Sequence, residues 1–132
     1  MKIIMLSGKN SCGKTTTLNL LYKLVLLKNG KSTCKKQLGG NKNDFSDVVQ
    51  FNNKTIAFFT MGDYSLEVCN AIKKYDNLKI DILICACNSR FIKPFQLIKN
   101  YTYKIINKTL ASNKSDEIGS NQKDMDLIMD LI

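Results

Sequence analysis

Two kinds of hydrophobic spacing recur along the chain, and each predicts a different element. Short apolar runs between polar turns predict strands within a sheet. The expected single strands are Lys2–Leu6, Ser32–Gln37, Ile80–Cys87 and Tyr101–Asn107. Two β-branched and aromatic runs separated by Asn52-Asn53-Lys54 predict a β-hairpin over residues 47–60.

Apolar residues three and four positions apart predict helices between these strands. The first is expected over residues 14–28, where Asn29-Gly30 stops it. A second is expected to start near Ser65, which is a candidate N-cap. A short helix around Pro94–Lys99 and a closing helix from Asn121 complete the pattern.

The order of these elements predicts an α/β fold. Right-handed crossovers turn alternating strands and helices into a mostly parallel central sheet covered on both faces, which is a three-layer sandwich, here with one β-hairpin. No repeat or linker divides the sequence. Residues 1–132 are therefore expected to form a single domain.

The charge distribution favours an anionic ligand. The formal net charge is +9, and residues 1–115 hold 19 Lys/Arg against 6 Asp/Glu, whereas residues 116–132 hold 1 against 5. Nucleic acid is an unlikely partner, because all the basic residues except Arg90 are lysines and base readout favours arginine forks.

Cysteine and histidine usage narrows the chemistry further. Five cysteines form no CxxC pair, and they are expected to be reduced thiols of a cytoplasmic protein. No signal peptide or membrane-spanning run is expected. The chain has no histidine, so any chemistry must use carboxylates, lysine, backbone amides or a hard metal ion.

The segment GKNSCGKT, residues 8–15, matches the phosphate-loop pattern G-x-x-x-x-G-K-[ST] between an expected strand and an expected helix. A loop that wraps a phosphate must present successive backbone N–H groups, and glycine permits the required backbone angles. Lys14 is expected to reach the β- and γ-phosphates, and Thr15 to give its hydroxyl to Mg²⁺. The expected nucleotide contacts in this segment are Gly8, Lys9, Asn10, Ser11, Cys12, Gly13, Lys14, Thr15 and Thr16.

On these residues the chain resembles the P-loop NTPase superfamily, closely over its first third and by architecture over the rest. The resemblance implies a P-loop NTPase-like domain that binds a nucleoside triphosphate with Mg²⁺. ATP is favoured over GTP. Asn113–Asp116 matches the guanine-reading motif N-K-x-D, but such a match arises easily in a chain rich in Asn and Lys, and it lies beyond the strand that should carry it.

Lys9 raises the question of oligomeric state. A second lysine after the first glycine resembles the deviant Walker A motif of dimeric ATPases, in which it contacts the phosphates across a homodimer. Asn10 and Ser11 depart from the glycines of those families. The alternative is a solvated lysine at a variable position.

The carboxylate that completes a Mg²⁺ site is not obvious. The apolar run before Met61 ends in Thr60 where a Walker B aspartate is usual. Asp63 is the favoured metal-holding or water-positioning acid, although it could instead cap the following helix. Asp44 is a second metal candidate, placed where switch-type NTPases sense the γ-phosphate, and its alternative is an ordinary loop residue.

Arg90 follows the carboxyl end of the most apolar strand, the edge at which α/β sheets bind ligands. It could pair with a phosphate or with an acidic second substrate, or it could be a surface arginine. Cys12, inside the loop, is expected to react readily with thiol reagents, and the alternative is that it merely fills a variable position.

Three functions remain open. The favoured one is slow, Mg²⁺-dependent hydrolysis of a nucleoside triphosphate by a switch protein with a partner protein, in which Lys14 and Asp63 are catalytic. A small-molecule kinase using ATP is the first alternative, although a single arginine leaves little for a lid. A non-hydrolysing nucleotide-binding module is the second.

Overall fold

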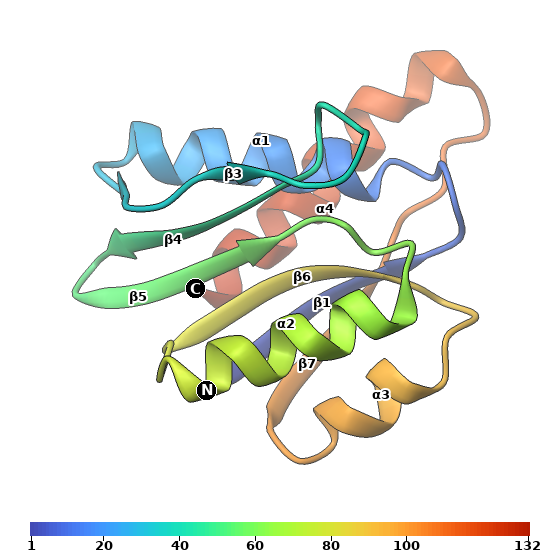
Figure 1. Cartoon of the computed structure of the whole chain (residues 1–132). Coiled ribbons are helices and arrows are strands. Elements are labelled where there is room, and N and C mark those ends of the chain that lie inside the picture. The colour runs from blue at the N-terminus through green and yellow to red at the C-terminus, as the bar shows by residue number, and fades with distance from the viewer.

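A mostly parallel seven-stranded sheet with four helices forms the α/β architecture of the computed structural model, which describes residues 1–132 (Figure 1). The strands are β1 Lys2–Gly8, β2 Lys31–Ser32, β3 Lys36–Gln37, β4 Phe45–Phe51, β5 Lys54–Phe59, β6 Ile82–Asn88 and β7 Thr102–Asn107. The helices are α1 Lys14–Leu27, α2 Ser65–Asn77, α3 Lys93–Ile98 and α4 Glu117–Leu131, with a 3-10 turn, η1, at Lys114–Asp116.

The strand order places β1 inside the sheet. The order is β2-β4-β5-β6-β1-β7, with β3 also paired to β4. Strands β5, β6, β1 and β7 run parallel, so their carboxyl ends meet at one edge. The register pairs Gly8 with Asn88 and Ser7 with Asn107. The segment after β1 therefore leaves the sheet between the ends of β6 and β7.

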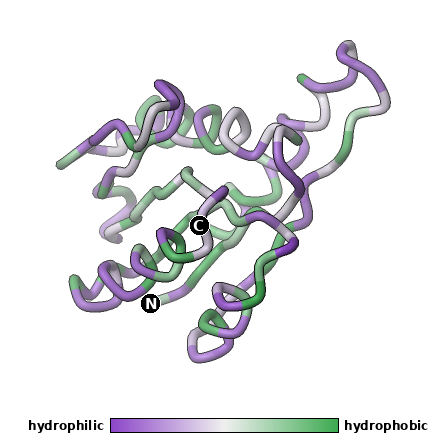
Figure 2. Tube along the Cα trace, turned by 45° about the vertical axis from the view of Figure 1, so that its right-hand side comes forward, coloured by the Kyte–Doolittle hydropathy of each residue, from purple (hydrophilic) through white to green (hydrophobic).

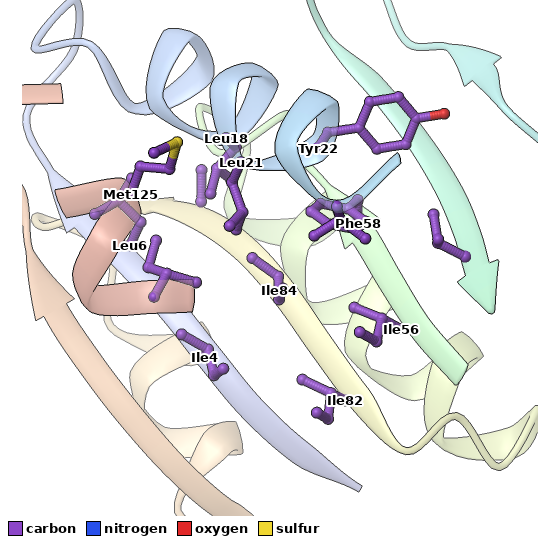
Figure 3. Close-up of a cluster of buried hydrophobic side chains, with 14 of the residues drawn as sticks. Ile4, Leu6, Leu18, Leu21, Tyr22, Ile56, Phe58, Ile82, Ile84 and Met125 are labelled. Atoms are coloured by element: carbon purple, nitrogen blue, oxygen red, sulfur yellow. The ribbon is translucent and has the colours of Figure 1, made fainter. Parts of the chain in front are cut away.

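Helices cover both faces of the sheet, as the hydrophobic pattern predicts. Helices α1 and α4 pack on one face and α2 and α3 on the other (Figure 1). On the first face, Leu18 and Leu21 of α1 point toward Ile84 and Phe58 of the sheet, beside Met125 of α4 (Figure 3). Each fully buried side chain of this size contributes about 1.5–3 kcal/mol. The hydrophobic stretches accordingly follow the central strands (Figure 2).

The predicted hairpin is present as β4 and β5. Asn52 and Asn53 both have left-handed backbone angles, with φ of 52° and 62°. Two such residues form the turn whose twist matches that of paired strands, and asparagine tolerates it better than most residues. Strand β4 begins at Phe45, two residues before the expected start.

The expected edge strand Ser32–Gln37 is not continuous, because a buried carboxylate interrupts it. Asp47 accepts hydrogen bonds from the Tyr22 hydroxyl (2.7 Å), the Ser32 hydroxyl and the Cys34 N–H (2.9 Å). Burial opposes ionisation of Asp47, but these hydrogen bonds outweigh it and hold its pKa below the usual value. The chain bends around Asp47, which leaves only the two-residue strands β2 and β3.

Two helix starts also differ from expectation. Helix α2 begins at Ser65 itself, and its N-cap position is Tyr64, without a side-chain cap. Helix α4 begins at Glu117, four residues before Asn121. None of the helices combines the length and the apolar character needed to cross a membrane.

Candidate functional site

The loop after β1 bends sharply before α1 begins. Gly13 occupies the N-cap of α1 with φ of 98°, a left-handed conformation that glycine adopts at little cost, and Ser11 also has positive φ, at 57°. The neighbouring strands hold the base of the loop. The N–H of Ser89 donates to the Gly8 carbonyl over 3.1 Å, and that of Lys108 to the Ser7 carbonyl over 2.7 Å.

The backbone donors of this loop have no acceptor in the protein. None of the eight N–H groups of residues 9–16 donates a hydrogen bond to backbone or side chain, and the first one engaged is Thr17, which donates to Gly13. The last of these eight belong to the first turn of α1, where the helix dipole is positive. Unpaired donors and this dipole together favour an anion.

Lys14 adds a buried positive charge to these donors. Its Nζ donates to the carbonyl oxygens of Gly8 (2.9 Å) and Lys9 (2.7 Å). The ammonium group therefore lies against the loop, with the Cys12 Sγ 3.8 Å away. Lys9 itself is exposed, and the homodimer contact suggested by the sequence remains a prediction.

Asp44 is the carboxylate that the structure brings to Thr15. The Thr15 hydroxyl donates to Asp44 Oδ1 over 3.1 Å, and the Thr60 hydroxyl donates to the same oxygen over 3.0 Å. Asp44 is buried, and its second oxygen has no partner in the protein. Hydroxyl and carboxylate oxygens are ligands that Mg²⁺ accepts.

Asp63 and Thr15 line one polar cleft, but no hydrogen bond joins their side chains. Asp63 is exposed and follows Gly62, whose backbone crosses the end of β6 so closely that a Cβ there would lie 2.6 Å from the carbonyl carbon of Ala86. Its position leaves the carboxylate free to face solvent at the cleft. The structure contains no cluster of three or more aspartate, glutamate or cysteine side chains that could hold a metal ion by themselves.

The loop opens into a polar cleft of about 590 Å³. One wall is the loop with the first turn of α1, and the other consists of the segment after β7 with the start of α4. Only three of its 19 lining residues are hydrophobic. A cleft of this size and polarity suits a charged small molecule.

The far wall depends on a buried ion pair that the sequence did not indicate. Lys108 Nζ lies 2.9 Å from Asp124 Oδ2, with side chains only 1% and 0% exposed. The N–H and hydroxyl of Thr109 also donate to Asp124, each over 2.7 Å. Nearby, Thr17 donates to Asn121 over 3.2 Å. The only sequence signal is helical spacing, since Asn121 and Asp124 fall on the same face of α4 as Met125.

Two candidate segments lie outside this cleft. Arg90 lines a separate groove on the other side of the sheet edge. Asn113–Asp116, which includes η1, is exposed: Asn113 accepts a hydrogen bond from the Asp116 N–H, and Asp116 accepts one from Ser112 (2.6 Å). These contacts are local, and none of the four residues lines the cleft.

The chain matches no protein-family model, and searches of curated proteins and of solved structures found no match.

Proposed function

We propose that this protein is a P-loop NTPase that binds a nucleoside triphosphate with Mg²⁺ and hydrolyses it slowly, as a switch. The observation that carries the proposal is the run of eight unpaired N–H groups over residues 9–16, with the Lys14 ammonium beside them. A polyphosphate supplies the acceptors that these donors lack and neutralises the charge.

Magnesium is proposed to bind where Thr15 meets Asp44. The Thr15 hydroxyl and the unpartnered oxygen of Asp44 could each contribute a ligand, directly or through water, while phosphate oxygens and water complete the shell. When bound, the ion would offset charge on the triphosphate.

For hydrolysis, water attacks the γ-phosphorus and the diphosphate leaves with the bridging oxygen. Lys14 would stabilise the charge that develops on the phosphate oxygens. Asp63, exposed at the cleft, is proposed to orient the attacking water. Asp63 has no positioning contact from a neighbouring side chain, which is consistent with slow turnover.

ATP is the proposed nucleotide. The guanine-reading match Asn113–Asp116 does not reach the cleft, so nothing there favours GTP. The residues available to contact a base are those of the far wall, such as Asn121 and the segment Thr109–Ala111.

The test is titration calorimetry with ATP and Mg²⁺, together with release of inorganic phosphate. Lys14→Ala is expected to weaken binding at least about tenfold, because hydrogen bonds to charged groups contribute about 1.5–3 kcal/mol. Lys23→Ala removes an exposed lysine of the same helix and should leave affinity unchanged. Thr15→Ala should lower the gain in affinity that Mg²⁺ brings. Parental affinity in Lys14→Ala would contradict the proposal.

The same assay separates the alternatives. A switch releases phosphate from ATP by itself, whereas a kinase consumes ATP only when an acceptor from a metabolite mixture is present. Binding without turnover in either case indicates a non-hydrolysing module.

A further inference from the structure

A second hollow lies on the face of the sheet that carries α2 and α3. It has a volume of about 600 Å³ and runs between the first turns of α2, the segment after β6 and helix α3. These elements lie side by side away from α1 and α4 (Figure 1). Its apolar lining includes Leu66, Cys69, Phe91 and Leu97. We call it the α2–α3 groove.

Two apolar side chains that line this groove are largely exposed. Leu66 is 69% exposed and Ile92 is 68% exposed, one on each side of the groove. Single exposed apolar residues are ordinary, but two beside an apolar hollow form the kind of patch that binds a partner.

The positive charges at this groove have no partner within the molecule. Lys73, Arg90 and Lys93 all line it, and no aspartate or glutamate does. The molecule contains a single ion pair, Lys108–Asp124, so none of the three cations is neutralised. Burial raises the pKa of the Cys69 thiol, and the charges of Lys73 and Lys93, which line the same groove, act in the opposite direction.

We propose that the α2–α3 groove docks an acidic, amphipathic segment of a partner protein. An apolar side chain of that segment fills the hollow between Leu66 and Ile92, and its carboxylates meet Lys73, Arg90 and Lys93. A concave apolar hollow accommodates an inserted apolar side chain better than it accommodates a flat lipid surface. The phosphate backbone of a nucleic acid has no apolar group that could fill the hollow.

A hydrogen-bonded side chain links this groove to the loop before α1. The Asn88 amide donates to Asn10 Oδ1 over 2.7 Å, and its oxygen accepts from the Arg90 N–H over 3.0 Å. Asn88 is buried, and its own N–H donates to the Gly62 carbonyl over 2.9 Å. A ligand that moves Asn10 is therefore expected to shift the Asn88 side chain and so alter its hydrogen bond with the Arg90 N–H. This coupling rests on the proposed nucleotide site, whereas docking in the groove does not.

The docking test uses a fluorescent synthetic 16-residue peptide with leucines at helical spacing flanked by glutamates, and a counterpart with lysine in place of each glutamate. Fluorescence anisotropy should show binding of the acidic peptide that weakens with salt, and at least tenfold weaker binding of the lysine counterpart. The double variant Lys73→Glu/Arg90→Glu and the variant Leu66→Ser should each lose at least tenfold in affinity. All three changed side chains line the groove and are exposed, and circular dichroism checks that the variants fold.

The matched control is the double variant Lys23→Glu/Lys28→Glu, which makes the same charge change at two exposed lysines on and just after α1 and should bind like the parent. Equal binding of both peptides, no binding of the acidic peptide, or no effect of the groove variants would overturn the proposal. Phosphatidylserine vesicles provide the last arm. If the groove variants lose vesicle binding while the acidic peptide does not bind, the surface belongs to a membrane and the proposal is wrong.

The coupling test repeats the peptide titration with ATP and Mg²⁺ present. The nucleotide should change peptide affinity at least threefold, and Asn10→Ala should remove this change while peptide affinity without nucleotide stays the same, because it breaks the contact with Asn88 and leaves the Asn88–Arg90 contact intact. Calorimetry checks that this variant still binds nucleotide. If nucleotide binds and peptide affinity does not respond, the coupling is wrong. If nucleotide does not bind, the proposed function fails, and the peptide titration alone still decides whether the groove docks an acidic segment.

Discussion

The polar cleft and the α2–α3 groove lie at the same edge of the sheet, and both carry positive charge held in different ways. In the cleft, Lys14 is fixed by two backbone carbonyls and Lys108 by Asp124. In the groove, Arg90 and the two lysines have no acidic partner. Charges held in fixed positions select a ligand by the arrangement of its charged groups. Mobile charges beside apolar surface select a ligand by the sign of its charge and tolerate different shapes.

Of the changes predicted here, removal of Asp124 should lower the free energy of unfolding the most, because it affects a fixed charge of the cleft. Asp124→Leu leaves the Lys108 ammonium buried without a counter-charge and Thr109 without its acceptor. We expect a loss of about 3–5 kcal/mol in the free energy of unfolding, measured by urea denaturation. The groove variant Lys93→Met, which removes an exposed cation without an acidic partner, should change the free energy of unfolding by less than about 0.5 kcal/mol.

The double variant Lys108→Met/Asp124→Leu, measured in the same way, separates the effect of the unpaired charge from that of local packing. Replacing both partners with apolar side chains removes the uncompensated charge, so most of the lost stability should return. A double variant as unstable as Asp124→Leu would show that packing around Thr109, rather than the ion pair, carries the effect.

Gly13→Ala should have the next largest effect and should act on the cleft alone. Alanine resists φ of 98°, and its Cβ would lie 2.8 Å from Asn121 Oδ1. We expect about 1–3 kcal/mol of destabilisation and weaker binding of ATP with Mg²⁺ in calorimetry. Gly40→Ala is the control, because its Cβ meets nothing within 4 Å and should be nearly neutral. Equal behaviour of the two variants would argue against a special backbone at Gly13.

Thiol labelling should report on the cleft through Cys12, with no change in stability. Cys12 lines the cleft and Cys69 the groove. Burial raises the pKa of Cys87 to about 12, which keeps that thiol unreactive. In a Cys34→Ser background, ATP with Mg²⁺ should slow labelling of Cys12, as read by mass spectrometry of peptides, whereas Cys69, which is buried and has a raised pKa, should label slowly with or without nucleotide. Unchanged labelling of Cys12 would place the nucleotide elsewhere.

The sequence predicted those parts of the fold that local spacing determines. The apolar runs around β1 and β6 and the Asn52-Asn53 turn of the hairpin appear as expected, because each depends on neighbouring residues only. The broken edge strand was missed because its cause is Asp47, which lies on another strand. The early start of α4 was missed because Gly119 and Ser120 are poor helix formers.

The candidate site was less predictable than the loop within it. A motif of eight residues identified the loop, but the sequence favoured Asp63 over Asp44 as the metal-holding acid. Only the path of residues 38–44 across the molecule brings Asp44 to Thr15. The pairing of Lys108 with Asp124 joins the segment after β7 to a helix 16 residues further on, and no local pattern encodes it.

The two carbonyl contacts of Lys14 have a consequence for discrimination among anions. Any anion that recruits this ammonium must compete with the Gly8 and Lys9 oxygens already engaged by it. Chloride can replace only one contact at a time, whereas a chain of linked phosphates engages several amides of the loop as it displaces both. At Lys14 the loop backbone is therefore expected to disfavour single small anions.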